Sequence, residues 1–141
     1  MRLPGRTFKN GGYWIIEVPM LAVTTQGKTK KDAFDMIADA IESLVNVEGF
    51  KIQVFPGSGD YFEIGSSGFT ILASFLLRRR RMIQGLTLKE VAIRLGARSL
   101  NTYARYEQGR AVPTIETFDR LMSALSGDED FVLTESSASK I

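Results

Sequence analysis

The sequence contains no cysteine and no histidine. Without cysteine there can be no disulfide bond and no thiolate metal ligand. Without histidine the chain lacks the side chain that most often acts as a general base or metal ligand near neutral pH. No apolar run approaches the roughly 18 residues of a membrane span, and the first residues lack the apolar core of a signal peptide. We therefore expect a cytoplasmic protein without a membrane segment, a metal or a cofactor.

The 141 residues allow one domain or two very small ones, and their charge is unevenly distributed. Residues 1–66 carry seven basic and eight acidic side chains, whereas residues 67–125 carry ten basic and four acidic ones. Such a basic segment is attracted to nucleic-acid phosphates, but a basic surface alone is weak evidence because solvated basic faces are common. Residues 126–141 are acidic and then rich in serine, a composition that predicts a disordered tail in which residues 131–133 could still form a short strand.

The first 27 residues have the pattern of three strands. Leu3–Lys9 and the aromatic, β-branched run Tyr13–Val18 flank Asn10-Gly11-Gly12, where Asn-Gly suits the positive φ angles of a tight hairpin. Pro19 ends the second strand, and residues 23–26 favour a short third one.

A helix and two further strands are predicted next. Thr29 with Asp32 is typical of a helix N-cap, and apolar residues then repeat at helical spacing at Ala33, Phe34, Ile37, Ile41, Leu44 and Val45. Residues 51–55 favour a strand and residues 61–64 a short edge strand. This order predicts an α+β fold with one helix on one face of a small sheet. The other face stays open unless a partner or second subunit covers it.

Two patterns suggest a phosphate-binding loop and a carboxylate site, but we favour a structural explanation for each. Gly27-Lys28-Thr29 resembles the end of a phosphate-binding loop, but Ala22 stands where the first glycine is required, so we favour a turn and a helix cap. The carboxylates of the predicted helix could bind Mg²⁺ or act as acid and base, or form an acidic patch for a basic partner. A solvated helix face explains the same spacing, and we favour it for Asp32, Asp35, Asp39 and Glu42.

The segment from residue 11 to residue 45 contains a characteristic series of motifs. They are Gly11-Gly12-Tyr13, Glu17-Val18-Pro19, Thr25-Gln26-Gly27 and the helix from Thr29 through Ala40. Through these motifs the segment resembles the HicB antitoxin family. Family members usually have a Gly-Cys or similar pair where this chain has residues 20–23. The resemblance implies a partly built ribonuclease-H-like fold without nuclease chemistry. It also implies a partner, the small HicA toxin, which is an RNase that depends on a histidine. Tyr13 and Trp14, with the exposed sheet face, are our predicted toxin contacts.

The C-terminal part has the pattern of four short helices. They are expected at residues 71–84, at 88–95, from the N-cap residue Ser99 to about Gln108, and from Pro113 onward. Thr87 and Glu90 form a capping box, and Ala92 is small enough for the close helix crossing of a helix-turn-helix. This part resembles the Cro/repressor type of helix-turn-helix, through Gly85-Leu86-Thr87, Glu90-Val91-Ala92, Leu95-Gly96, Thr102-Tyr103, Tyr106-Glu107, Gly109-Arg110 and Pro113.

The match departs from the common spacing by one extra residue between Gly96 and Thr102, which makes a longer turn. HicB proteins with this kind of C-terminal domain share the longer turn. In the repressor family a glutamate at the position of Glu107 pairs with an arginine of the first helix. The resemblance therefore implies that Arg81 is its buried partner, while Arg78, Arg79 and Arg80 are solvated or face phosphates. We divide the chain into domains at residues 1–66 and 67–125, with the tail at 126–141.

The docking geometry of this motif suggests the DNA contacts. The N-terminal end of the recognition helix meets base edges in the major groove. Asn101 and Arg105 are four residues apart and share a helix face, where asparagine can pair with adenine and arginine with guanine. Solvent exposure without DNA contact is the alternative. The predicted base contacts are Ser99, Leu100, Asn101, Thr102 and Arg105, and the predicted phosphate contacts are Thr87, Lys89, Arg94, Arg98 and Arg110. Tyr103 and Tyr106 are more typical of core residues than of base-stacking ones.

Three functions are compatible with these patterns. The leading one is an antitoxin that blocks a HicA-type RNase and represses its own operon as a homodimer or a larger homo-oligomer such as a tetramer. The alternative is a stand-alone repressor whose N-terminal domain binds a small ligand or dimerises. A metal-dependent nuclease using Asp35, Asp39 and Glu42 is the weakest, because too few catalytic groups accompany them.

Overall fold

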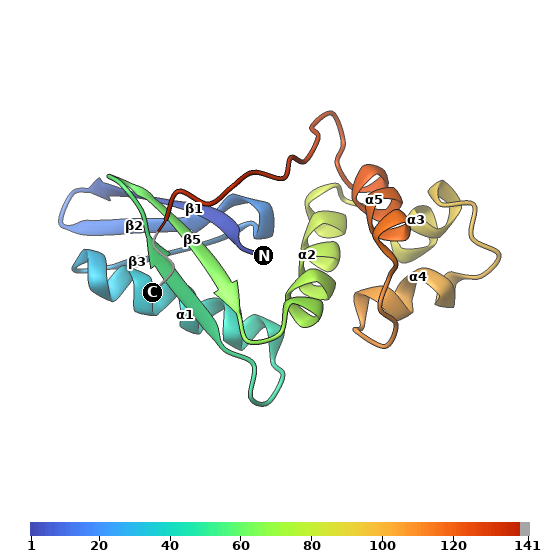
Figure 1. The fold of residues 1–141 in the computed structure, drawn as a ribbon, viewed down its shortest axis with the longest axis horizontal. Helices are drawn as coiled ribbons and strands as arrows, with labels where there is room; N and C mark the ends of the chain where they lie inside the picture. The colour runs from blue at the N-terminus through green and yellow to red at the C-terminus, as the bar shows by residue number, and fades with distance from the viewer. Residues whose placement is uncertain (139–141) are drawn as a thin grey trace. The chain divides into compact units, whose positions relative to one another are not determined.

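The computed structural model describes residues 1–138 and divides the chain into two compact units (Figure 1). The first unit comprises Met1–Phe69 together with the segment that begins at Glu135, and the second comprises Thr70–Thr134. The chain therefore returns to its first unit at the C-terminal end. The fold is mixed, with an antiparallel sheet in the first unit and short helices in the second.

The sheet of the first unit has five antiparallel strands in the order β3-β2-β1-β5-β4. Their bounds are β1 Leu3–Asn10, β2 Tyr13–Val18, β3 Val23–Gly27, β4 Ile52–Pro56 and β5 Tyr61–Ser66. The prediction that residues 61–64 form an edge strand was wrong, because β5 pairs with both β1 and β4. Phe62 and Ile64 of this interior strand are fully buried.

The hairpin between β1 and β2 turns on two glycines. Asn10 pairs with Tyr13, so Gly11 and Gly12 are the central residues of the turn. Gly11, rather than Asn10, adopts the left-handed backbone, with φ at 61°. After β2 the chain forms a short 3₁₀ helix, η1 (Pro19–Leu21), which the sequence pattern did not suggest.

One long helix, α1 (Lys30–Val45), covers one face of the sheet (Figure 1). It begins where the Thr29 hydroxyl accepts a hydrogen bond from the Asp32 amide at 3.0 Å. Ala33, Ile37 and Ile41 are fully buried against the sheet. Leu44 is 44% exposed, so the apolar stripe expected to reach it ends one turn earlier.

Gly27 allows β3 to approach the first turn of α1. A Cβ atom at this position would lie 2.3 Å from the backbone nitrogen of Ala33, a distance at which the two atoms overlap. Gly27 therefore has a packing role, which supports the interpretation of this segment as a turn and helix start.

The open face of the sheet is the one opposite α1. Side chains alternate between faces along each strand, and cross-strand partners share a face. Ile16 and its partner Thr7 are buried on the α1 side, so Ile15 and its partner Phe8 lie on the open face.

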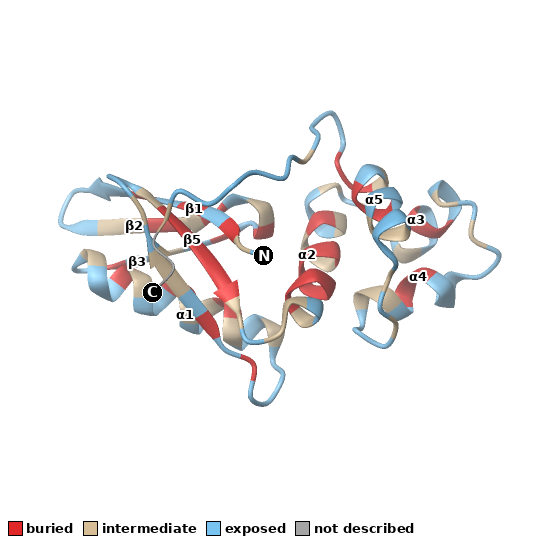
Figure 2. Cartoon of the chain, viewed as in Figure 1, coloured by how far each residue is buried: buried red, intermediate tan, exposed pale blue. Residues whose placement is uncertain are grey.

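The second unit is a bundle of four helices, α2 (Phe69–Ile83), α3 (Leu88–Arg94), α4 (Leu100–Glu107) and α5 (Ile115–Ala124), of which α2 starts at the last residue of the first unit. Its core includes Val91, Tyr103, Leu121 and Leu125, all at most 1% exposed. Figure 2 shows the buried residues concentrated along α2 and on the inner sides of the shorter helices.

The C-terminal tail has no helix or strand within residues 126–138, and the expected strand at 131–133 is not formed. Val132 and Leu133 are 85% and 90% exposed. The tail is nevertheless attached at two points, through Phe131 in the second unit and Ser136 in the first. A disordered tail was predicted over 126–141. Its last three residues lie outside the described ones.

Candidate nucleic-acid interface

The position of the recognition helix α4 depends on a link to α2. Arg81 of α2 and Glu107 of α4 form an ion pair with Nη2 2.7 Å from Oε1, and Nε donates to Oε2 at 2.9 Å. Arg81 Nη1 also donates to the Leu86 carbonyl oxygen at 2.9 Å, in the turn that precedes α3. One guanidinium therefore holds α2, the following turn and α4 together.

Two of the four consecutive arginines differ from what the family resemblance implied. Arg80 is the most buried, at 6% exposed, and its guanidinium carbon lies 5.2 Å from the centre of the Phe131 ring. Arg80 therefore does not face solvent or phosphate as expected. Arg81 is only half-buried, although it forms the pair with Glu107.

Both ends of α3 have a defined backbone structure. At its start, Thr87 caps the helix by accepting a hydrogen bond from the Glu90 amide at 3.1 Å. At the end of α3, Gly96 has φ at 65° and its amide donates to the Ile93 carbonyl, while the Ala97 amide donates to the Ala92 carbonyl at 2.9 Å. These two bonds form a Schellman motif, which satisfies the last carbonyls of a helix. The longer turn from Ala97 to α4 thus starts from a fixed helix end.

Helix α5 supports this arrangement from the side opposite the turn. Arg120 of α5 donates to the Leu95 carbonyl at 3.0 Å, and Arg94 of α3 donates to the Ala124 carbonyl at 3.2 Å. Arg94 was predicted as a phosphate contact. Its side chain is exposed but also joins α3 to α5, so it has a structural role in addition.

The residues predicted to contact bases share one exposed region. Ser99, Leu100, Asn101, Thr102 and Arg105 are all exposed. Asn101 and Arg105 line one depression together with Ala104, Gln108 and Arg110. Gln108 was missing from the predicted contacts, although it lies seven residues after Asn101 on the same helix face. Glutamine, like asparagine, can pair bidentately with adenine.

Ser99 occupies the N-cap position of α4 but does not cap it as expected. Its hydroxyl lies 3.2 Å from the Thr102 hydroxyl, and no side-chain hydrogen bond reaches the helix amides. Both hydroxyls are exposed at the N-terminal end of the recognition helix, where base edges are usually met.

Four basic side chains remain available around this region. Within residues 1–138, no side-chain hydrogen bond or ion pair holds Lys89, Arg98, Arg105 or Arg110, and all four are exposed.

Helix α4 also contains a buried aromatic residue. Tyr103 is fully buried, as predicted, whereas Tyr106 is half-buried. Burial raises the pKa of the Tyr103 phenol, and the nearby Glu107 carboxylate raises it further. The Tyr103 hydroxyl is buried and forms no hydrogen bond of normal geometry within residues 1–138.

The predicted toxin contacts in the first unit lie on opposite sides of the sheet. Trp14 is two residues from Ile16 and therefore on the α1 side, where the Lys30 ammonium group lies 5.6 Å from the centre of its ring. Tyr13 lies on the open face and is 45% exposed. A partner that lies flat on the open face would contact Tyr13 and not Trp14. Tyr13 is therefore the predicted toxin contact on the open face, and Trp14 is not part of that face.

Two acidic residues of α1 form contacts with other groups of the first unit. Asp35 pairs with Lys31 at 3.3 Å, and Glu42 accepts a hydrogen bond from the Ile52 amide at 2.9 Å. Across the described part of the chain, no group of three or more acidic side chains is arranged to hold a metal ion. The Glu42 carboxylate instead joins the end of α1 to the start of β4.

Comparison with known protein families identifies the second unit. Residues 74–131 match the family model described as a helix-turn-helix domain. This match covers most of α2, all of α3 to α5 and the first part of the tail, and it supports a DNA-binding role for the surface described above. No curated protein matches the chain. No helix within residues 1–138 is both long and apolar enough to cross a membrane.

Proposed function

We propose that the chain is an antitoxin that neutralises a HicA-type mRNA endoribonuclease and represses its own operon by binding operator DNA. The observation that carries this proposal is the pairing of two different units in one chain. A helix-turn-helix domain with an exposed recognition helix follows a small sheet whose motifs resemble those of HicB proteins.

The DNA-binding half of the proposal has the stronger support. Residues 67–125 are strongly basic, and the exposed side chains of Arg98, Arg105 and Arg110 lie within or next to α4 in sequence. Phosphate contacts by Lys89, Arg98 and Arg110 would position the domain, while Asn101 and Arg105 would read bases. Reading two half-sites one helical turn apart requires two copies, so we propose a homodimer or a larger homo-oligomer.

The toxin-binding half of the proposal depends on the first unit. A sheet with one covering helix is consistent with the partly built ribonuclease-H-like fold that the HicB resemblance implies, and its open face presents Phe8, Tyr13 and Ile15. Phe8 and Tyr13 are 42% and 45% exposed, as suits an aromatic contact surface. We infer that this unit binds protein and has no catalytic activity. Glu42 accepts a hydrogen bond from the Ile52 amide, and no group of acidic side chains within residues 1–138 is arranged to hold a metal ion.

Affinity purification of the tagged chain from its own cells, with the bound proteins identified by mass, tests this proposal. A small, basic, histidine-containing partner at stoichiometric yield is expected. If the chain is recovered alone yet still binds DNA, the stand-alone repressor becomes the better description, and the first unit then binds a small ligand or another copy.

A further inference from the structure

A buried carboxylate lies on the open face of the sheet. Glu63 of β5 is 4% exposed and shares this face with its cross-strand partners Pro4 and Phe55. A buried charge is unfavourable unless hydrogen bonds and an opposite charge compensate it. The open face therefore contains a polar site that requires partners.

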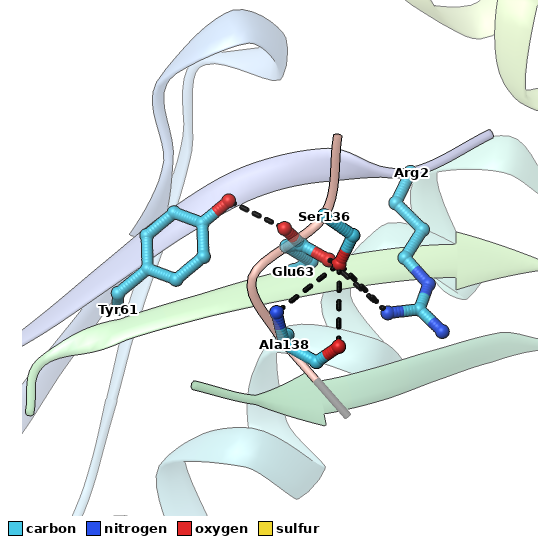
Figure 3. Close-up of polar contacts among 5 residues, drawn as sticks. All are labelled: Arg2, Tyr61, Glu63, Ser136 and Ala138. Atoms are coloured by element: carbon cyan, nitrogen blue, oxygen red, sulfur yellow. Dashed lines mark hydrogen bonds and ion pairs between the residues drawn. The ribbon is translucent and has the colours of Figure 1, made fainter. Parts of the chain in front are cut away.

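Three side chains from separate parts of the chain supply those partners (Figure 3). The Tyr61 hydroxyl donates to Oε2 of Glu63 at 2.5 Å, and Arg2 Nη1 donates to Oε1 at 3.1 Å. The third donor is the hydroxyl of Ser136, from the C-terminal tail, which also binds Oε1. Burial alone would raise the pKa of the Glu63 carboxyl, but hydrogen bonds from Ser136, Tyr61 and Arg2 together lower it.

Arg2 and Tyr61 would remain in place without the tail. The Arg2 guanidinium carbon lies 3.5 Å from the centre of the Phe55 ring, on the neighbouring strand β4. Tyr61 belongs to β5 itself, two residues before Glu63, and lies on the same face. Tyr61 is therefore part of the sheet and Arg2 directly precedes β1, whereas Ser136 is the donor that the described part of the tail brings to this cluster.

Within residues 135–138, the tail contacts the sheet side chains through Ser136. Glu135, Ser136 and Ser137 are exposed, and within residues 1–138 no backbone hydrogen bond joins this segment to a strand. Among the described residues, the Ser136 hydroxyl contacts Glu63, Arg2 and the backbone of Ala138. A segment that offers an equivalent donor to Glu63 can therefore take the place of Ser136.

We propose that the β4–β5 half of the open face is a docking surface for a polypeptide segment that offers a hydrogen-bond donor to Glu63. Residues 135–138, which we call the tail strap, fill this surface until a partner segment replaces them. The proposal rests on the proposed binding of a protein partner by the first unit. The favoured partner presents a serine, threonine, lysine or arginine to Glu63 and an apolar surface to Phe8 and Ile15 on the same face.

Two substitutions test whether the partner binds Glu63 itself or only needs the tail strap to be absent from the surface. Both are expected to release the tail strap. Ser136→Ala removes the donor of the strap and leaves Glu63 ready for a partner. Glu63→Gln also weakens the strap, but it removes the charge that the partner donor would meet. Ser137→Ala is the matched control, because Ser137 is the exposed neighbour.

The experiment uses the full-length chain and the partner recovered by native affinity purification. Backbone ¹⁵N relaxation reports whether residues 135–138 are ordered, and calorimetric titration gives the partner Kd. With Ser136→Ala we expect a mobile strap and a Kd lowered about threefold, because the partner no longer competes with the strap. With Glu63→Gln we expect a mobile strap and a Kd raised about tenfold. Ser137→Ala should change neither quantity.

Several results would overturn the proposal while leaving the antitoxin function intact. They are a strap that is already mobile in the wild type, a partner Kd that Ser136→Ala does not change, and tighter binding by Glu63→Gln. Recovery of no partner at all would instead refute the proposed function, and the docking role with it.

Discussion

Arg81 and Glu107 are 26 residues apart in sequence, yet Nη2 of the arginine lies 2.7 Å from Oε1 of the glutamate. This bidentate ion pair joins α2 to the C-terminal end of the recognition helix α4. Hydrogen bonding to Glu107 raises the pKa of Arg81, so the guanidinium stays positively charged at physiological pH. The orientation of the DNA-reading surface thus depends on one planar, bidentate contact.

Glu107→Gln is expected to destabilise the second unit by about 1–3 kcal/mol, because a half-buried guanidinium loses its charged partner. Arg81→Lys should cost a similar amount, since lysine keeps the charge but cannot bind bidentately. Helical circular dichroism during urea unfolding is the appropriate measurement, because Trp14, the single tryptophan, reports on the first unit. Unfolding midpoints equal to the wild type would show that the pair is unimportant.

Arg105→Ala is expected to weaken binding to operator DNA by about 1–3 kcal/mol while leaving toxin binding unchanged. The loss should be much smaller on unrelated DNA, because a base contact carries sequence information and a phosphate contact does not. Fluorescence anisotropy with labelled operator and scrambled duplexes gives both values. Equal operator affinities for the wild type and the variant would exclude Arg105 as a base-reading residue.

Arg110→Ala should behave differently from Arg105→Ala, because Arg110 is predicted to contact phosphate. We expect weaker binding to operator and scrambled DNA alike, with the slope of log K against log salt reduced by about 1. Lys89→Ala is the parallel case on α3. A loss confined to the operator would place Arg110 among the base contacts instead, next to Arg105 and Gln108 in the same depression.

Gly27→Ala is expected to destabilise the first unit by about 1–3 kcal/mol or more, because the added Cβ would overlap the backbone of Ala33. Gly12→Ala is a suitable control, since a Cβ there meets nothing within 4 Å and its φ is not positive. Tryptophan fluorescence from Trp14 follows the unfolding of this unit. Equal stability of the two variants would show that β3 does not approach α1 so closely.

The Glu63 carboxyl should make stability depend on pH in the acid range. Its pKa in the folded state lies below the ordinary value of 4.5, so its stabilising contribution is present above pH 4.5 and is lost as the pH falls through the folded pKa. The difference in unfolding free energy between the wild type and Glu63→Gln should therefore be constant above pH 4.5 and shrink below it. A difference that does not change with pH would indicate that folding does not lower the pKa of Glu63.

Local features of the fold could be predicted from the sequence because short-range chemistry determines them. Thr29 and Thr87 cap their helices as the residues that follow them suggested. Adjacent glycines mark the β1–β2 hairpin, although Gly11 rather than Asn10 supplies the positive φ. The helix-turn-helix pattern likewise depends on residues that lie close together in sequence.

Features that depend on distant residues were not predictable from local patterns, and the Arg81–Glu107 pair was expected only through the resemblance to the repressor family. The interior position of β5 follows from its pairing with β1, some sixty residues earlier, which no local pattern encodes. Arg80 is buried beneath Phe131, a tail residue that composition alone assigned to disorder. The Glu63 cluster brings together residues 2, 61 and 136, and only the folded chain shows that they meet.

Inhibition of the partner RNase tests the antitoxin claim most directly. The purified partner would be incubated with an mRNA substrate while the full-length chain is titrated into the reaction. We predict that cleavage falls linearly and stops at a fixed stoichiometric ratio, and that the Arg105→Ala variant inhibits equally well because the DNA surface takes no part. Cleavage that continues undiminished in the presence of excess chain would contradict the proposal and leave a DNA-binding repressor without a toxin.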